Sequence, residues 1–257
     1  MRVVVALKQI PDLVEELELA SGGTDVDREF LKFVLNEFDD QALEEALCLK
    51  ESAGGEVTVV AFDEPDADRT LYTALAKGAD RAVKLVGVGE GWLSGHRRAG
   101  LLASFLGNAA FDLVLTGVQA ADDLDGQLPA LLGARAGLPH VSVVVRVELD
   151  GPRAKVSQEL GGGTVAEEEV QLPAVLGIQT ARQAPRYVSI SRYREIQQAG
   201  GIEEVEIQSS ADEPDTYRLR RLFPPDTAGH AEMLTGTPAE VAERIAELIR
   251  SKGLVKS

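Results

Sequence analysis

The stretch FDLVLTGVQAADDLDGQLPALLGARAG, residues 111–137, decides the fold class because it holds a strand, a loop and a helix in direct succession. FDLVLTG is an apolar run of the kind that forms a strand buried on both faces of a sheet. GQLPALLGARAG is predicted to be a helix. The loop between them carries Asp122, Asp123 and Asp125. Loops in this position hold phosphate in many α/β proteins, yet carboxylates repel phosphate, so the role of this loop has to be argued from its surroundings.

The same alternation of strand and helix occurs four times up to residue 137. Strands are predicted at 2–10, 56–62, 81–88 and 111–117, and helices within 37–55, 63–80, 91–110 and 126–137. Repeated strand–helix units of this kind predict a parallel sheet with helices on both faces. The expected fold class is therefore α/β.

The pattern changes in residues 140–180. Asp150-Gly151 and the three glycines at 161–163 separate alternating segments, which predicts hairpin turns between antiparallel strands. We therefore expect a hairpin extension on the parallel sheet.

The C-terminal part is polar and proline-rich before it becomes helical. It is predicted to form an extended arm, closed by an amphipathic helix with Thr237 as N-cap and Pro238 at the first helical position. We expect two parts, an α/β domain with its hairpin extension at 1–208 and an arm with a helix at 209–257. The arm either lies on another subunit or packs on its own domain.

Composition argues against several classes of protein. The 257 residues carry a formal net charge of −16, so binding nucleic acid through a basic face is not expected. The single cysteine, Cys48, is interpreted as a core residue, and the three histidines follow no metal-ligand spacing. MRVVVALKQI is predicted to be a strand rather than a leader peptide, and no segment has the apolar length of a membrane span. A cytoplasmic protein without a bound metal or membrane insertion is expected.

Catalytic motifs are absent from the sequence. It contains no Gly-x-Ser-x-Gly or His-Glu-x-x-His pattern, and neither a Gly-x-x-x-x-Gly-Lys-Ser/Thr loop nor a Gly-x-Gly-x-x-Gly fingerprint. Nothing pairs a nucleophile with a base, so no catalytic residue is predicted.

The loop after the fourth predicted strand is the best candidate for a binding site. Gly117 and Gly126 allow close approach of a ligand to the backbone. The following helix is predicted to begin near Gly126 or Gln127, so its free amides point into the loop and suit an adenosine phosphate. The aspartates are expected to cap the helix, face solvent or bind ribose hydroxyls. An ordinary helix start with aspartate caps is the alternative interpretation.

Several segments together resemble the β subunit of electron-transfer flavoproteins. The likeness is carried by VVVALKQIPD, LNEFDDQALEEALCLKE, TLYTALAKGADRAV, LTGVQAADDLDGQ, LPAVLGIQTARQAPRY and TAG, which follow the family order and cover nearly all of the chain. The resemblance implies a flavodoxin-like or adenine-nucleotide-hydrolase-like α/β domain. It also implies a heterodimer, in which the arm from about residue 209 embraces an α subunit.

The family's cofactors and partners follow from the same resemblance. FAD would be held mostly by the α subunit, and AMP would be bound in this subunit without a redox role. Electrons would pass from flavin dehydrogenases, such as those for acyl-CoA, toward a quinone oxidoreductase, and this subunit would have no catalytic side chains of its own.

The resemblance assigns site residues by matching position. The nucleotide positions are Ala6, Asn36, Glu37, Phe38, Asp39, Phe62, Gly117, Val118, Gln119, Ala120, Ala121, Asp122, Asp123, Leu124, Asp125, Gly126, Gln127 and Leu128. Leu13 and Phe38 match two positions near the flavin ring, although Leu13 departs from the family's aromatic residue. Ile190 matches an exposed apolar residue that anchors the partner dehydrogenase, and a strand residue facing the core is the alternative for it.

Two other functions stay open. In bifurcating members of the family, a second FAD occupies the nucleotide site and electrons come from NADH. The pair Asp122-Asp123 favours AMP, but Leu124 and Gln127-Leu128-Pro129 depart from the family pattern. A free-standing adenine-nucleotide-binding module is the third interpretation, and the long arm argues against it.

Overall fold

The computed structural model of the chain describes residues 1–14, 16–29, 31–88, 93–123, 126–207, 219–224 and 233–254. The chain divides into two compact units, Met1–Arg221 and Leu222–Ser257. The boundary expected after residue 208 lies outside the described residues. In the part of the chain that is described, no helix is long and apolar enough to cross a membrane.

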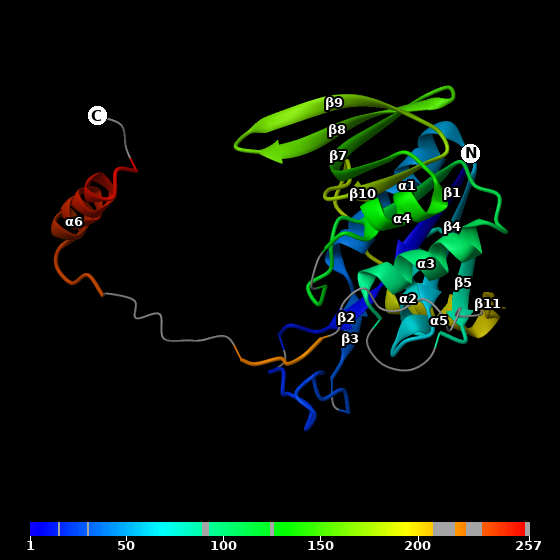
Figure 1. Cartoon of the computed structure of the whole chain (residues 1–257), viewed down its shortest axis with the longest axis horizontal. Helices are drawn as coiled ribbons and strands as arrows, with labels where there is room; N and C mark the ends of the chain where they lie inside the picture. The colour runs from blue at the N-terminus through cyan, green and yellow to red at the C-terminus, as the bar shows by residue number, and fades with distance from the viewer. Residues whose placement is uncertain are drawn as a thin grey trace. The chain divides into compact units, whose positions relative to one another are not determined.

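The first unit is a doubly wound α/β domain (Figure 1). Its described strands form a nine-stranded sheet in the order β11-β5-β4-β1-β6-β10-β7-β8-β9, and β2 pairs with β3 in a separate two-stranded sheet. The strands are β1 Arg2–Leu7, β2 Gln9–Pro11, β3 Phe33–Leu35, β4 Glu56–Phe62, β5 Arg81–Val86, β6 Leu113–Gly117, β7 His140–Asp150, β8 Arg153–Gly161, β9 Thr164–Gln171, β10 Ala174–Ile178 and β11 Ile202–Glu206. The helices are α1 Glu37–Ala53, α2 Ala67–Lys77, α3 Gly95–Leu106, α4 Leu128–Ala136, α5 Ile190–Ala199 and, in the second unit, α6 Pro238–Ser251. The expected α/β class is confirmed.

Strand β1 lies at the centre of the sheet and is buried on both faces. Val3, Val5 and Leu7 pack in the core cluster that contains α1 and α2. Val4 and Ala6 pack on the opposite face, with α3 and α4. Successive side chains of a strand point to opposite faces of the sheet, so the apolar residues of β1 enter both cores. This is why the sequence of β1 is apolar throughout and does not alternate with polar residues.

The hairpin extension is confirmed, but one of its strands was wrongly assigned. Strands β7, β8 and β9 are antiparallel neighbours, and their turns fall at the predicted glycines. Strand β10 was grouped with them, yet it pairs in parallel with β6 on one side and with β7 on the other. All five of its residues are buried, because it completes the parallel core rather than the exposed extension. Its unbroken sequence AVLGI is the same signal that identified β1.

Local signals at the helix ends explain where the helices begin and stop. Gly78 ends α2 and accepts a positive φ of 122°, and Ser94 caps α3 by accepting a hydrogen bond from the Arg97 amide. In the second unit, Thr237 and Glu240 form a capping box at the start of α6, as the sequence predicted for Thr237.

Two buried glutamates on α1 anchor the segment that leads to α5. Glu44 accepts hydrogen bonds from the Arg186 guanidinium, the Arg186 amide and the Gln183 amide group. Glu45 is paired in the same way with Arg182. Burial pushes the pKa of Glu44 upward, but the hydrogen bonds from Arg186 and Gln183 outweigh it and leave the pKa below its ordinary value. The segment before α5 is thus held on α1 by charge-assisted hydrogen bonds.

Arg186→Ala is expected to destabilise the fold by about 3 kcal/mol, because Glu44 would stay buried without its charged partner. Because the pKa of Glu44 is lowered in the folded protein, the stabilisation by the Glu44–Arg186 pair is present at neutral pH and is lost as the pH falls through the range in which carboxyl groups titrate. Denaturant unfolding at neutral and acidic pH measures both effects. Arg192→Ala, which removes an exposed ion pair with Glu195, is the matched control. Equal losses of unfolding free energy in the two variants would contradict the stabilising role of the Glu44–Arg186 pair.

Candidate functional site

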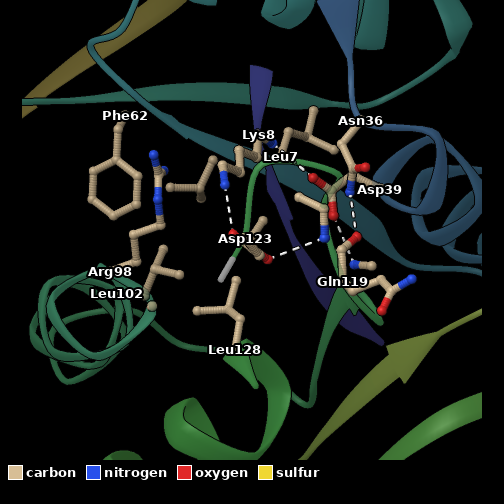
Figure 2. Close-up of a pocket in the computed structure, with 15 residues that line it drawn as sticks. Leu7, Lys8, Asn36, Asp39, Phe62, Arg98, Leu102, Gln119, Asp123 and Leu128 are labelled. Carbon is tan, nitrogen blue, oxygen red and sulfur yellow. Dashed lines mark hydrogen bonds and ion pairs between the residues drawn. The ribbon is translucent and has the colours of Figure 1, made fainter. Parts of the chain in front are cut away.

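A cavity lies where β1, β4 and β6 end. These strands are neighbours with β1 in the middle, and the chain winds outward from β1 through β4 and β5 before it returns to β6 on the other side. Open α/β sheets bind ligands at such a reversal of winding, outside the carboxyl ends of the strands. Figure 2 shows the cavity, which is lined by Ala6, Leu7, Lys8, Asn36, Asp39, Val60, Phe62, Gly95, Arg98, Leu102, Gly117, Gln119, Ala120, Asp123 and Leu128.

Asp39 joins three elements at the floor of this cavity. It belongs to the first turn of α1, and its carboxylate accepts the Gly117 amide at 2.8 Å and the Lys8 amide at 2.8 Å. Burial raises the pKa of Asp39 to about 7, although these amides, Asn36 and the Lys8 charge all favour the ionised form. A Cβ at Gly117 would lie 2.5 Å from the Asp39 carboxylate, so only glycine fits there. Asp39 therefore fixes the ends of β1 and β6 against α1.

Lys8 explains why the loop carries aspartates. Its ammonium lies 2.6 Å from an oxygen of Asp122 and 2.6 Å from an oxygen of Asp123, and its side chain is only 7% exposed. The other oxygen of Asp123 accepts the Ala120 amide at 3.0 Å. The two carboxylates thus share one buried cation, which offsets one of their two negative charges, and their pairing with it orders the loop.

Of the roles expected for the aspartates, Asp122 and Asp123 do not take the capping of α4. Gln127 is the N-cap residue and makes no side-chain cap hydrogen bond, while Asp122 and Asp123 turn toward Lys8. The attraction of the buried ammonium for both carboxylates outweighs a cap on an exposed helix start. Asp125 and Leu124 lie outside the described residues.

Arg98 forms the wall of the cavity opposite Asp39. It is a buried residue of α3 whose guanidinium donates to Glu64 and lies over the Phe62 ring, 5.3 Å from the ring centroid (Figure 2). A planar cation stacked on an aromatic ring provides a flat surface for a planar ligand group.

The structure brings about half of the expected nucleotide residues together. Ala6, Asn36, Asp39, Phe62, Gly117, Gln119, Ala120, Asp123 and Leu128 line the cavity. The remaining described positions lie nearby in the chain but do not line it, namely Glu37, Phe38, Val118, Ala121, Asp122, Gly126 and Gln127. Lys8 and Arg98 were not predicted to belong to the site. The only sequence signal for Lys8 was its place directly after a buried strand, and the only signal for Arg98 was its place early in a helix.

The two residues expected to contact partners lie elsewhere on the surface. Leu13 is 61% exposed in the segment after β2, and Ile190 is 64% exposed. Ile190 is the first residue of α5, after the N-cap Ser189, and not part of a loop. Its exposure excludes the alternative of a core strand residue.

The fold and the cavity define a doubly wound α/β protein with a ligand site at the point where the winding reverses. Residues 25–210 match the family model described as "Electron transfer flavoprotein domain". The chain is 36% identical, over 262 aligned positions, to the electron transfer flavoprotein subunit beta of Methylophilus methylotrophus, covering 97% of this chain and 98% of that protein. It is 27% identical to the electron transfer flavoprotein subunit beta of Bacillus subtilis, and the alignment covers 99% of this chain and 100% of that protein. The electron transfer flavoprotein subunit beta of Clostridium acetobutylicum is 34% identical, and the alignment covers 75% of this chain and 73% of that protein.

The chain therefore belongs to the electron transfer flavoprotein family, and its resemblance to the β subunit is confirmed. Membership supports a role in electron transfer that involves a flavin.

The raised pKa of Asp39 predicts a pH-dependent contribution to stability. Its pKa rises from 3.8 to about 7 in the folded protein, which therefore holds this proton more tightly than the unfolded chain. The contribution of Asp39 to the free energy of unfolding is largest below pH 3.8 and is lost as the pH rises toward about 7. We expect the difference in unfolding free energy between wild type and Asp39→Asn to fall with rising pH and to level off above neutrality. Denaturant titrations across this range test it; a difference that does not change with pH would argue against the assignment.

Proposed function

We propose that this chain is the β subunit of a heterodimeric electron-transfer flavoprotein that binds AMP in the cavity at the ends of β1, β4 and β6. The complex carries electrons from flavin dehydrogenases, such as acyl-CoA dehydrogenases, through FAD toward a quinone oxidoreductase. The β subunit contributes no catalytic side chain, and it works in the cytoplasm. The observation that carries the proposal is the partly apolar cavity beside the start of α4, at the point where the winding of the sheet reverses.

The residues of the cavity fit an adenosine phosphate. Leu102, Leu128 and the Phe62–Arg98 stack provide apolar and planar walls that suit a base. Asn36 and Asp39 supply the polar groups that suit ribose hydroxyls. The amides at the start of α4, together with the positive end of its dipole, suit the phosphate. Lys8 favours this by offsetting one of the two negative charges of Asp122 and Asp123.

The redox chemistry belongs to the flavin, which accepts and donates electrons when bound. The residues of this chain position it. Phe38 belongs to the first turn of α1, the helix that also carries Asp39 into the cavity. Leu13 is exposed on the segment after β2 and is free to contact an α subunit. Ile190 presents an exposed apolar side chain that suits transient docking of a dehydrogenase.

Nucleotide release tests the proposal directly. The heterodimer is purified with its α subunit and denatured, and FAD and AMP are quantified by chromatography. We expect equal amounts of FAD and AMP. Two FAD without AMP would move the protein to the bifurcating class that oxidises NADH. Adenine nucleotide on this chain without a stable α complex would favour a free-standing binding module and contradict the proposal.

Lys8→Met is expected to weaken AMP binding by about ten- to a hundred-fold, because Asp122 and Asp123 would keep their charge without a buried partner. The triple variant with Asp122→Asn and Asp123→Asn should recover most of the affinity, since it removes the two carboxylates that Lys8 pairs with. Calorimetric titration of AMP into the heterodimer measures both. Lys155→Met, which breaks an exposed pair with Asp150, is the control. Failure of the triple variant to recover would show that Lys8 contacts the phosphate itself.

A further inference from the structure

The buried polar atoms that lack a hydrogen-bond partner belong to residues of one small pocket. Among the described residues, four buried side-chain atoms receive or donate no hydrogen bond: Oε1 and Nε2 of Gln9, Nε of Arg98 and Oδ1 of Asp122. All three residues line the same pocket. A buried polar group without a hydrogen-bond partner destabilises the folded protein, so three such residues around one space indicate a partner that they share.

The three residues come from parts of the chain that are far apart in sequence. Gln9 is a residue of β2 and is 3% exposed, Arg98 belongs to α3 and is 5% exposed, and Asp122 lies in the loop after β6. Arg98 donates to Glu64 through a terminal nitrogen, which leaves the hydrogen of Nε unused. Oδ1 of Asp122 lies 2.6 Å from the Lys8 ammonium and, as a carboxylate oxygen, can accept a further hydrogen bond.

The charge and the size of the pocket decide what it accepts. Glu64 and Asp122 border it and would repel an anion, whereas Arg28 and Arg98 would repel a cation. The occupant must also both donate and accept hydrogen bonds, because Arg98 can only donate, Asp122 can only accept and the Gln9 amide does both. The pocket has a volume of about 10 Å³, which is about the room that one water molecule needs in a cavity. Water is the neutral molecule that meets these conditions.

We propose that this pocket binds one ordered water molecule, which accepts a hydrogen bond from Nε of Arg98 and donates to the oxygen of Gln9 and to Oδ1 of Asp122. Three hydrogen bonds are the usual number for a buried water, and they satisfy three of the four atoms. The water joins β2 to α3 and to the loop after β6. The inference concerns only residues of this chain, so it does not rest on the proposed function.

A crystal structure of the full chain, in the complex in which it is isolated and at a resolution that shows ordered solvent, tests the site directly. We expect a water oxygen about 2.7–3.2 Å from the Gln9 side chain, from Nε of Arg98 and from Oδ1 of Asp122. A side chain of another subunit or a solute ion in this place would overturn the inference. A pocket in which Gln9 and Arg98 bond directly to protein groups would overturn it as well.

The melting temperature of Gln9→Met provides a second readout. Methionine keeps the unbranched shape of glutamine but cannot hold the water, so Arg98 and Asp122 would lose their shared partner. We expect the melting temperature to fall by about 3–8 °C. Gln171→Met, which removes an exposed hydrogen bond to the Pro152 carbonyl, is the matched control and should change it little. In a pocket without water, Gln9→Met would replace an unsatisfied amide, and the melting temperature would stay the same or rise; that result would overturn the inference.

Discussion

The carboxylate of Asp39 holds together the part of the molecule on which the site depends. It receives the amide that follows β1 and the last amide of β6, while its own backbone starts α1. Parallel strands leave their final amides without ladder partners at the sheet edge, and a buried group has to satisfy them. One side chain does so for both central strands. This explains why glycine stands at position 117, where a larger residue would occupy the space of that carboxylate.

Charge neutralisation is the second condition for a ligand at this edge. A protein of net charge −16 would have to bind the proposed nucleotide, which is also negatively charged, against its own field. Local pairing reduces the repulsion, because Lys8 offsets one of the two negative charges of Asp122 and Asp123 and Arg98 pairs with Glu64 on the opposite wall. The positive end of the α4 dipole also favours an anion at this loop. An acidic loop and a phosphate site are therefore compatible.

The sequence predicted the fold well because its strongest signals are local. The apolar runs of β1, β4, β5 and β6 and the glycines after the helices could be read without knowledge of the fold. Strand β10 was misassigned because pairing partners are a long-range property, and five apolar residues do not show which neighbours they have. The same limit applies to the site. Glycines and aspartates drew attention to the loop, but Lys8, which lies 115 residues from Asp123 in the chain, could be connected to it only by the folded structure.

Helix α1 connects the proposed nucleotide site with the segment proposed to dock a dehydrogenase. Its first turn contributes Asp39 to the cavity, and its next turns contribute Glu44 and Glu45, which hold the segment before α5 and Ile190. A nucleotide bound as proposed would stabilise the first turn of α1, and through the same hydrogen-bonded helix it would stabilise the anchor of Ile190. On the proposed function, a ligand without redox chemistry would in this way contribute to electron transfer, because it would help to hold the docked donor in a fixed place.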